Sequence, residues 1–324
     1  MSLGSLPGFR DFYPAELAER THIMTAWREV ARRYGFAEYD GPPLEPLELY
    51  TRKSGDEIVG QLYNFVDKGG REVALRPEMT PTFARMVAAR ANALRKPVRW
   101  FSVPQLFRYE RQQRGRLREH FQLNVDIVGE ADVTADAELL AVALDIMREL
   151  GLTREDVVAR VSDRRLLNAL LTGQQIPEAI YPQVYDVLDK FGRQPEDVSQ
   201  EKLVKAGLTP LHASEFVGFV RESVTAGTIE SVSRALKTPD GIEFLDRLRR
   251  YSEYVSALIG ESAADWVRFD LSIVRGLAYY TGIVFELFDA KGELRAICGG
   301  GRYDRLFAGL TGIDVPALGF GFGD

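Results

Sequence analysis

An arginine-rich segment, residues 107–122, is the part of this sequence best suited to chemistry. Five arginines fall within eleven consecutive positions there, and two glutamates lie in the same segment. The flanking residues are apolar, which predicts a strand over 103–108, a turn over 112–116 and a strictly alternating strand over 121–128. Guanidinium groups held on such a hairpin can bind phosphate oxygens through paired hydrogen bonds. A solvated, salt-bridged hairpin without a function is the alternative that these residues leave open.

Three other segments combine polar residues with sharp backbone features. They are Leu-Arg-Pro-Glu-Met-Thr at 75–80, Arg-Gly-Leu-Ala-Tyr-Tyr-Thr-Gly at 275–282 and Cys-Gly-Gly-Gly-Arg-Tyr-Asp at 298–304. Arg275 lies in a largely apolar neighbourhood, where an idle cation is costly. It either binds an anion or pairs with Asp270 or Glu286. Three consecutive glycines allow a close backbone approach to a ligand, and a structural hairpin crossing explains them as well.

Taken in order, these segments resemble those of class II aminoacyl-tRNA synthetases of the histidyl family. Residues 107–122 are similar to motif 2, which opens with Phe-Arg-x-Glu and closes with Gly-Arg-x-Arg-Glu-x-x-Gln. The other three segments resemble the substrate loop and the two histidine-specific stretches of that family. The resemblance extends from Gly8 to the last residue, Asp324. By the family pattern, motif 3 begins in the final apolar segment, its arginine would lie just beyond Asp324, and an anticodon-binding domain would follow.

The resemblance implies that the protein activates L-histidine with ATP. The histidine carboxylate would attack the α-phosphorus and expel pyrophosphate, so catalysis would depend on positioning and cationic stabilisation rather than on a covalent nucleophile. Arg108 and Arg275 would be the catalytic cations at the α-phosphate. Glu110, Arg116 and Phe121 would bind the adenine amino group, the distal phosphates and the adenine ring of ATP. Mg²⁺ is expected with ATP, although the sequence assigns it no ligands.

The resemblance also implies a pocket for histidine. The matching residues are Glu78, Thr80 and Gln122 for the amino group and backbone, Asp126, Tyr279 and Tyr280 for the imidazole, and Arg275 and Gly300 beside them. Such a pocket would reject other amino acids because its polar groups would then stay unpaired. Three features depart from the family pattern. Met79 replaces a glycine, Ala278 replaces an aspartate, and His120 and Phe121 stand in the reverse of the common order.

The composition is that of an ordinary globular protein, with 45% hydrophobic and 27% charged residues among 324. No apolar run approaches the about 20 residues that span a bilayer, and no signal peptide precedes Gly8, so we expect a cytoplasmic protein without a membrane partner. One cysteine, Cys298, excludes an internal disulfide, and with three scattered histidines it offers no zinc-ligand spacing and no metal site. A net charge of −6 argues against nonspecific coating of nucleic acid.

The predicted fold class is α+β, a class II synthetase-like, mostly antiparallel sheet flanked by helices. Residues 1–164 and 261–324 would form this domain, and 165–260 would be a helical insertion. Predicted helices are 15–34, 81–91 with Thr80 as N-cap, 136–150, 181–191, 213–226 and 241–259. Predicted strands are 61–67, 72–76, 266–271, 283–288, 294–297 and 316–324, with an irregular strand at 39–43.

The resemblance implies a homodimer through the first helix and strand, and an insertion that touches the tRNA acceptor stem. A plain surface helix and a purely structural helical lobe are the alternatives that the residues leave open. Three hypotheses for function follow. The first is a histidine–tRNA ligase catalytic core acting on tRNA(His). The second is a synthetase-like regulatory subunit of ATP phosphoribosyltransferase that binds histidine without activating it, and the third is an arginine-rich nucleic-acid-binding module. The near-complete motif 2 favours the first, since a histidine sensor needs no ATP clamp.

Overall fold

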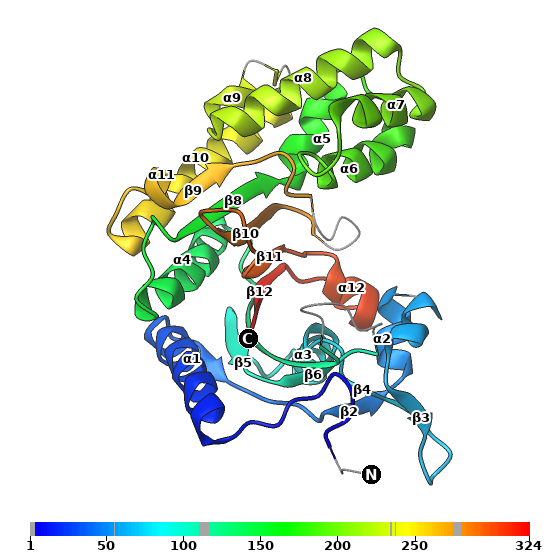
Figure 1. Cartoon of the computed structure of the whole chain (residues 1–324), viewed down its shortest axis with the longest axis vertical. Helices are drawn as coiled ribbons and strands as arrows, with labels where there is room; N and C mark the ends of the chain where they lie inside the picture. The colour runs from blue at the N-terminus through cyan, green and yellow to red at the C-terminus, as the bar shows by residue number, and fades with distance from the viewer. Residues whose placement is uncertain (1–3, 55, 110–116, 234, 237, 275–279) are drawn as a thin grey trace. The chain divides into compact units, whose positions relative to one another are not determined.

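The computed structural model describes residues 4–54, 56–109, 117–233, 235–236, 238–274 and 280–324. The chain divides into two compact units (Figure 1). The first unit comprises residues 1–131 and 304–324, and the second comprises residues 132–303.

The first unit contains one main sheet and one small sheet. The main sheet has the order β1 (Ala37–Glu38), β5 (Val98–Ser102), β7 (Glu119–Val128) and β12 (Ala317–Gly323), with β6 (Gln105–Phe107) paired to the start of β7. The β1–β5 pair is parallel and the other pairs are antiparallel. The small antiparallel sheet has the order β2 (Leu44–Pro46), β4 (Glu72–Leu75) and β3 (Asn64–Val66). The helical elements are α1 (Pro14–Arg33), α2 (Glu48–Ser54), η1 (Asp56–Gln61), α3 (Thr80–Ala89) and α12 (Leu306–Thr311).

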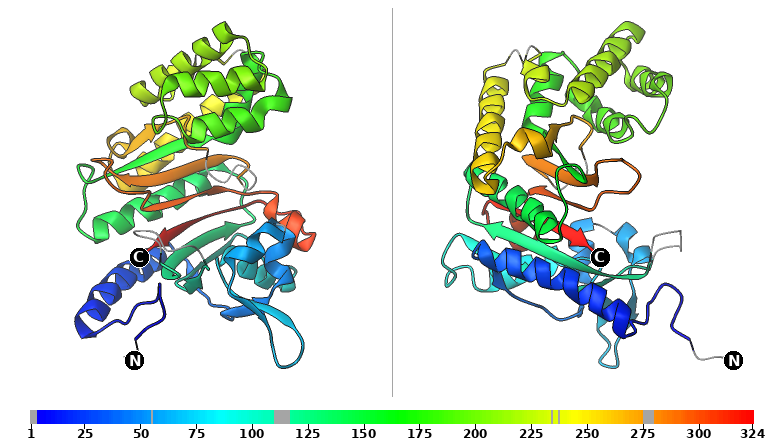
Figure 2. Two further views of the ribbon diagram at one scale, coloured as in Figure 1. Left: turned by 45° about the vertical axis from the view of Figure 1, so that its right-hand side comes forward. Right: turned by 60° about the vertical axis from the view of Figure 1, so that its left-hand side comes forward.

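The two faces of this main sheet differ because side chains alternate along each strand. Leu318, Phe320 and Phe322 of β12 are buried on one face, where the Phe322 ring lies 5.2 Å from that of Trp27 in α1. Helix α1 therefore covers the apolar face of the sheet, and it lies along the sheet in both views of Figure 2. The opposite face carries the polar residues of β7.

The second unit contains a four-stranded sheet and most of the helices. The sheet has the order β11 (Cys298–Arg302), β10 (Ile283–Asp289), β8 (Val157–Asp163) and β9 (Val267–Phe269). The helical elements are α4 (Val133–Glu149), α5 (Arg164–Gly173), η2 (Glu178–Ile180), α6 (Tyr181–Asp189), α7 (Glu196–Ala206), α8 (Pro210–Ala226), α9 (Glu230–Ser233), α10 (Pro239–Ile259) and α11 (Ala263–Trp266). Between residues 164 and 266, the described part of the chain forms helices and no strand. The assignment of 165–260 to an insertion domain stays a prediction.

The α+β prediction is confirmed, and most predicted elements occur within a few residues of their expected bounds. Helix α1 ends before Gly35, whose φ of +76° is the left-handed conformation that glycine supplies at helix ends. Helix α4 begins earlier than predicted because the Asp132 side chain accepts a hydrogen bond from the Thr134 N–H at 2.9 Å and caps it.

Three local predictions are wrong. Residues 39–43 form no strand and are instead the connection between β1 and β2. Thr80 is not the N-cap of α3, since it is the first helical residue and Met79 precedes it without a side-chain cap. The strand returning from β10 is not 294–297 but β11, where Phe285 is paired with Gly300. Glycines rarely favour strands. Gly301 is required in this strand because β11 approaches β10 closely. A Cβ on Gly301 would lie only 2.6 Å from the carbonyl oxygen of Ile283.

Candidate functional site

The polar face of β7 holds two of the predicted histidine-binding residues. Gln122 and Asp126 alternate with buried apolar residues and share this face with Asn124. Their partners on β12 are glycines, because Gly323, Gly321 and Gly319 pair with Gln122, Asn124 and Asp126. The structure therefore places a row of polar side chains beside a strip of bare backbone.

The glycine strip is what leaves room for these side chains. A Cβ added to Gly319 would lie 2.1 Å from Oδ1 of Asp126 and 2.8 Å from the carbonyl oxygen of Val125. A Cβ added to Gly321 would lie 2.9 Å from Cδ of Gln122. The carboxylate of Asp126 and the amide of Gln122 thus occupy the space above β12 that side chains would fill.

The substrate loop is anchored by a buried arginine that was not predicted as a site residue. Arg76 is 5% exposed, and its Nη1 donates to Asp40 at 2.8 Å and to the carbonyl of Gly41 at 2.7 Å. Its Nε donates to the carbonyl of Gln105, in β6, at 3.1 Å. These contacts fix the loop against β6. The burial of this arginine is not visible in the sequence, although its place in the Leu-Arg-Pro-Glu motif points to it.

Arg108 meets the same loop. Its Nε donates to the carbonyl oxygen of Pro77 at 3.2 Å, and its backbone N–H donates to the carbonyl oxygen of Arg118 at 2.9 Å. Arg108 is an exposed residue, and Glu78, the next residue after Pro77, is half-buried. The structure therefore brings the predicted α-phosphate cation together with the loop that carries Glu78 and Thr80.

Phe121 is placed apart from the other predicted residues of β7. Because side chains alternate, Phe121 and Gln122 point to opposite faces of the strand. The guanidinium of Arg20, in α1, lies 4.4 Å from the centre of the Phe121 ring, and the ring of Phe12 lies 6.1 Å away. The residue that shares the polar face is His120, which the sequence analysis did not select.

His120 is held neutral by its surroundings. Its pKa is lowered from 6.5 to about 4, mainly by burial and also by the nearby charges of Arg108 and Arg10, while Asp324 and Glu119 partly oppose this shift. A neutral imidazole can lie near the positively charged Arg108 without repulsion between two cations. In the reversed order His120-Phe121, the imidazole therefore faces the predicted site and the phenyl ring faces α1.

The lowered pKa of His120 predicts a pH-dependent stability. Between pH 6.5 and 4 the unfolded chain binds a proton at this histidine and the folded protein does not, so the free energy of unfolding falls as the pH falls through this window. We expect a loss of about 2 kcal/mol that a His120→Gln variant lacks. Urea unfolding of both proteins at pH 7 and pH 4.5 measures it. Equal losses in the two proteins would contradict this role.

In the second unit the structure describes Tyr280 and Gly300. Gly300 is buried in β11, and Tyr280 is half-buried beside Ser162 of β8 and Val284 of β10. The backbone N–H of Thr281 donates to the carbonyl of Arg302 at 2.7 Å, which ties the segment after Tyr280 to the end of β11. The remaining predicted site residues, Glu110, Arg116, Arg275 and Tyr279, lie outside the described residues.

Arg302 was also missed by the sequence analysis. Its side chain is 1% exposed, and it holds the carboxylate of Asp136, in α4, with Nε–Oδ1 and Nη2–Oδ2 distances of 3.0 and 2.6 Å. Arg247 of α10 approaches the same carboxylate at 3.2 Å. The Gly-Gly-Gly-Arg motif was the available signal, but it was interpreted through its glycines alone. The buried pair fixes the end of β11, which also accepts the hydrogen bond from Thr281, the residue after Tyr280.

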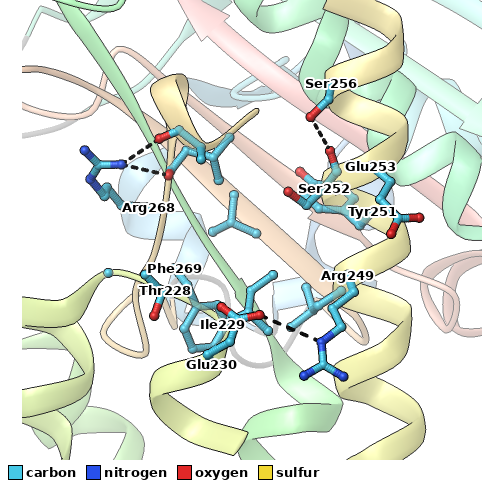
Figure 3. Close-up of a pocket in the computed structure, with 15 residues that line it drawn as sticks. Thr228, Ile229, Glu230, Arg249, Tyr251, Ser252, Glu253, Ser256, Arg268 and Phe269 are labelled. Carbon is cyan, nitrogen blue, oxygen red and sulfur yellow. Dashed lines mark hydrogen bonds and ion pairs between the residues drawn. The ribbon is translucent and has the colours of Figure 1, made fainter. Parts of the chain in front are cut away.

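The second unit also contains a pocket of about 450 Å³ beside α10, drawn in Figure 3. Val161, Leu248 and Phe269 form its buried apolar part, while Glu230 and Arg249 stand at its edge with an Nε–Oε1 distance of 3.8 Å. None of the predicted site residues that the structure describes lines it. The pocket is therefore not part of the predicted site.

Solved structures share this fold. The histidyl-tRNA synthetase from Nostoc sp. PCC 7120 superimposes with a TM-score of 0.86 at 25% identity, over 100% of this chain and 74% of that one. An ATP phosphoribosyltransferase regulatory subunit/histidyl-tRNA synthetase from Bacillus halodurans C superimposes with a TM-score of 0.85 at 24% identity, over 100% of this chain and 82% of that one. The polar, glycine-bordered sheet face and the β6–β7 strand pair thus belong to a class II aminoacyl-tRNA synthetase fold.

The sequence comparisons specify the family. The histidine–tRNA ligase of Opitutus terrae is 47% identical over 99% of this chain and 72% of its own length. The chloroplastic/mitochondrial histidine–tRNA ligase of Arabidopsis thaliana is 42% identical over 98% of this chain, which spans 63% of that protein. The family model described as histidyl-tRNA synthetase matches residues 8–323. The chain belongs to the histidyl-tRNA synthetase family. Among the described residues, no helix combines the length and apolar character needed to cross a bilayer.

Proposed function

We propose that this chain is the catalytic core of an aminoacyl-tRNA ligase that activates L-histidine with ATP and transfers it to tRNA(His). The hydrogen bond between Arg108 and Pro77 carries the proposal, because it joins Arg108, the residue after β6, to the substrate loop. An anion-binding arginine and the acceptors Glu78 and Thr80 then lie in one neighbourhood. The identity to histidine–tRNA ligases of 42 and 47% supports the same activity.

The proposed reaction needs no covalent step on the protein. Arg108 binds the α-phosphate and the attacking carboxylate, and Glu78, Thr80 and Gln122 hold the ammonium group and backbone of histidine. Asp126 accepts a hydrogen bond from the imidazole, and Tyr279, Tyr280 and Gly300 are assigned to histidine by the resemblance to the family. Placing the carboxylate in line with the phosphorus converts a bimolecular reaction into an intramolecular one, and the arginines offset the charge that develops.

The ATP contacts extend the proposal to residues outside the described part of the chain. Glu110 binds the adenine amino group, Arg116 the distal phosphates, and Arg275 supplies the second cation at the α-phosphate. The ring of Phe121 was predicted to stack on adenine. Its position on the α1 side of β7 does not support that role, and His120 shares the polar face instead. Mg²⁺ accompanies ATP in this proposal and offsets phosphate charge.

The proposal includes the partners of the family. The chain acts in the cytoplasm as a homodimer, in which α1 and the strand after it form the interface. Exposed Tyr13 and Leu17 at the start of α1 support this, being 69% and 40% exposed. Residues 165–260 form an insertion domain that meets the acceptor stem of tRNA(His).

Histidine-dependent exchange of pyrophosphate into ATP tests the proposed activity. We expect exchange that requires histidine and is not supported by the other amino acids, since adenylate formation is reversible and the pocket is specific. The assay uses this chain and, where the natural protein is longer, the full-length protein beside it. Histidine binding by calorimetry without exchange in either protein would overturn the ligase and favour a regulatory histidine-binding subunit.

A further inference from the structure

A buried carboxylate at the start of β7, that of Glu119, is paired with a cation from the N-terminal segment. The Glu119 side chain is 1% exposed, and Nε of Arg10 donates to its Oε1 at 2.9 Å. The amide of Gln105, in β6, donates to its other oxygen, Oε2, at 2.6 Å. Within the described ranges, Arg10 is the one basic residue that forms a salt bridge with Glu119. Because loss of one partner leaves a buried charge uncompensated, the junction of β6 and β7 depends on Arg10.

The same guanidinium also holds the end of β12. Nη2 of Arg10 donates to Oδ2 of Asp324 at 2.8 Å. The other carboxylate oxygen of Asp324 accepts a hydrogen bond from the backbone N–H of Phe121 at 3.0 Å, and the backbone N–H of Asp324 donates to the carbonyl of Phe121. Arg10 therefore links β7 to the end of β12 and, through Glu119, to β6.

The backbone beside Arg10 is fixed against the same strands. The carbonyl of Gly8 accepts a hydrogen bond from the backbone N–H of Arg118, the residue before β7, at 2.9 Å. The approach is close, since a Cβ on Gly8 would lie 2.8 Å from Cγ of Arg118. The ring of Phe9 lies 6.4 Å from that of Phe107 in β6. The guanidinium of Arg10 thus extends from a segment that is itself held in place.

Arg10 lies on the side of β7 that faces α1. Its guanidinium is 4.9 Å from the centre of the Phe12 ring, which in turn lies 6.1 Å from the ring of Phe121. Because side chains alternate along the strand, Glu119 and Phe121 share this side, and Gln122 points to the opposite one. Arg10 is therefore separated from the proposed substrate face by the strand, and it can act on that face only through the backbone.

Strand β6 carries the influence of Arg10 to the substrate loop. The carbonyl of Gln105 accepts a hydrogen bond from Nε of Arg76 at 3.1 Å, and the backbone N–H of Phe107 donates to the carbonyl of Arg76 at 2.9 Å. Arg108, the next residue, donates to the carbonyl of Pro77 at 3.2 Å. The strand that is tied to Arg10 therefore holds both Arg108 and the loop that Arg108 meets.

We propose that Arg10 is a positioning residue for histidine activation, whose ion pairs with Glu119 and Asp324 fix β6 and β7 so that Arg108 stays aligned with the substrate loop. This inference rests on the proposed function, because it takes Arg108 as the cation at the α-phosphate. Misplacing a catalytic group by about 1 Å can cost on the order of a hundredfold in rate. Since Arg10 lies away from the substrate face, its loss affects the alignment for reaction more than the binding of either substrate.

The test is histidine-dependent exchange of pyrophosphate into ATP by the whole chain, comparing the wild type with Arg10→Met. We expect kcat to fall roughly tenfold to a hundredfold, while the KM values for histidine and ATP change by less than about threefold. Arg10→Lys keeps the charge but lacks the planar fork that pairs with two carboxylates, so it is expected to recover part of kcat. Arg71→Met is the matched control, because Arg71 is 79% exposed and pairs with Asp67 at the surface, and its kcat is expected to equal that of the wild type.

A double variant separates the rate from the stability. Arg10→Met leaves the buried carboxylate of Glu119 uncompensated, and adding Glu119→Gln removes that charge. The double variant is therefore expected to regain stability in urea unfolding and to keep the low kcat, since the tether between Arg10 and the strands is still absent. A wild-type kcat in Arg10→Met, or a kcat that returns together with stability in the double variant, would overturn the inference and leave the proposed function standing. A wild type without histidine-dependent exchange would overturn both.

Discussion

Replacing Arg302 with methionine is expected to lower the free energy of unfolding by about 3–5 kcal/mol, the usual cost of removing one partner from a buried ion pair. The substitution leaves Arg247, at 3.2 Å, beside the buried carboxylate of Asp136. Burial already raises the pKa of Asp136, and Arg302 opposes that shift. Without the guanidinium the carboxyl would take up a proton more readily, and this limits the loss.

Urea unfolding at pH 7 measures this cost, and a double variant separates its causes. Arg302→Met combined with Asp136→Leu removes both charges, so it is expected to recover part of the stability lost in the single variant. Arg193→Met is the control, because the side chain of Arg193, in the turn after α6, is 70% exposed and its ion pair with Asp189 is a surface pair. A single Arg302→Met variant that loses less than about 1 kcal/mol would contradict a stabilising role for the pair.

Arg302→Met is also expected to weaken histidine binding. The carbonyl of Arg302 accepts a hydrogen bond from the backbone N–H of Thr281, the residue after Tyr280. A displacement of β11 would therefore also move Tyr280. If the stability falls while the affinity for histidine stays that of the wild type, the link from Arg302 to Tyr280 is wrong. The affinity is read by calorimetry at a temperature where the variant is folded.

Replacing Gly319 with alanine is expected to lower the free energy of unfolding by about 3 kcal/mol and to abolish measurable histidine binding. The new methyl group would lie 2.1 Å from Oδ1 of Asp126 and 2.8 Å from a backbone oxygen of β7. The carboxylate can turn away but the backbone cannot, so strand β12 must shift as well. Overpacking of this kind costs about 1–3 kcal/mol, and a rigid backbone neighbour favours the upper end.

The glycine strip supplies its own controls. Gly323→Ala introduces the same methyl group where nothing lies within 4 Å, so its stability and histidine binding are expected to match the wild type. Gly321→Ala should be intermediate, because the atoms that it meets belong to the flexible side chain of Gln122. Calorimetry with histidine and urea unfolding rank the three variants. Equal behaviour of Gly319→Ala and Gly323→Ala would exclude Asp126 from the space above β12.

Much of the fold could be predicted because its signals are local. Apolar spacing of three and four residues predicted α1, helical patterns predicted α8 and α10, and strict alternation predicted β7. The prediction failed for β11 because consecutive glycines have little strand propensity. These residues form a strand through their antiparallel pairing with β10. It also failed at Thr80, because a residue type that often caps helices stands here at the first helical position of α3.

The chemistry of the site divides in the same way. The sequence by itself determined the family and the order of its motifs, because these depend on residue types at fixed spacings. Only the tertiary structure decided that Arg302 meets Asp136, 166 positions away, that Tyr39 packs on Trp100, and that Phe121 faces α1 while His120 faces the polar side. Burial, strand register and pairing depend on partners far along the chain, and no local pattern of residues contains them.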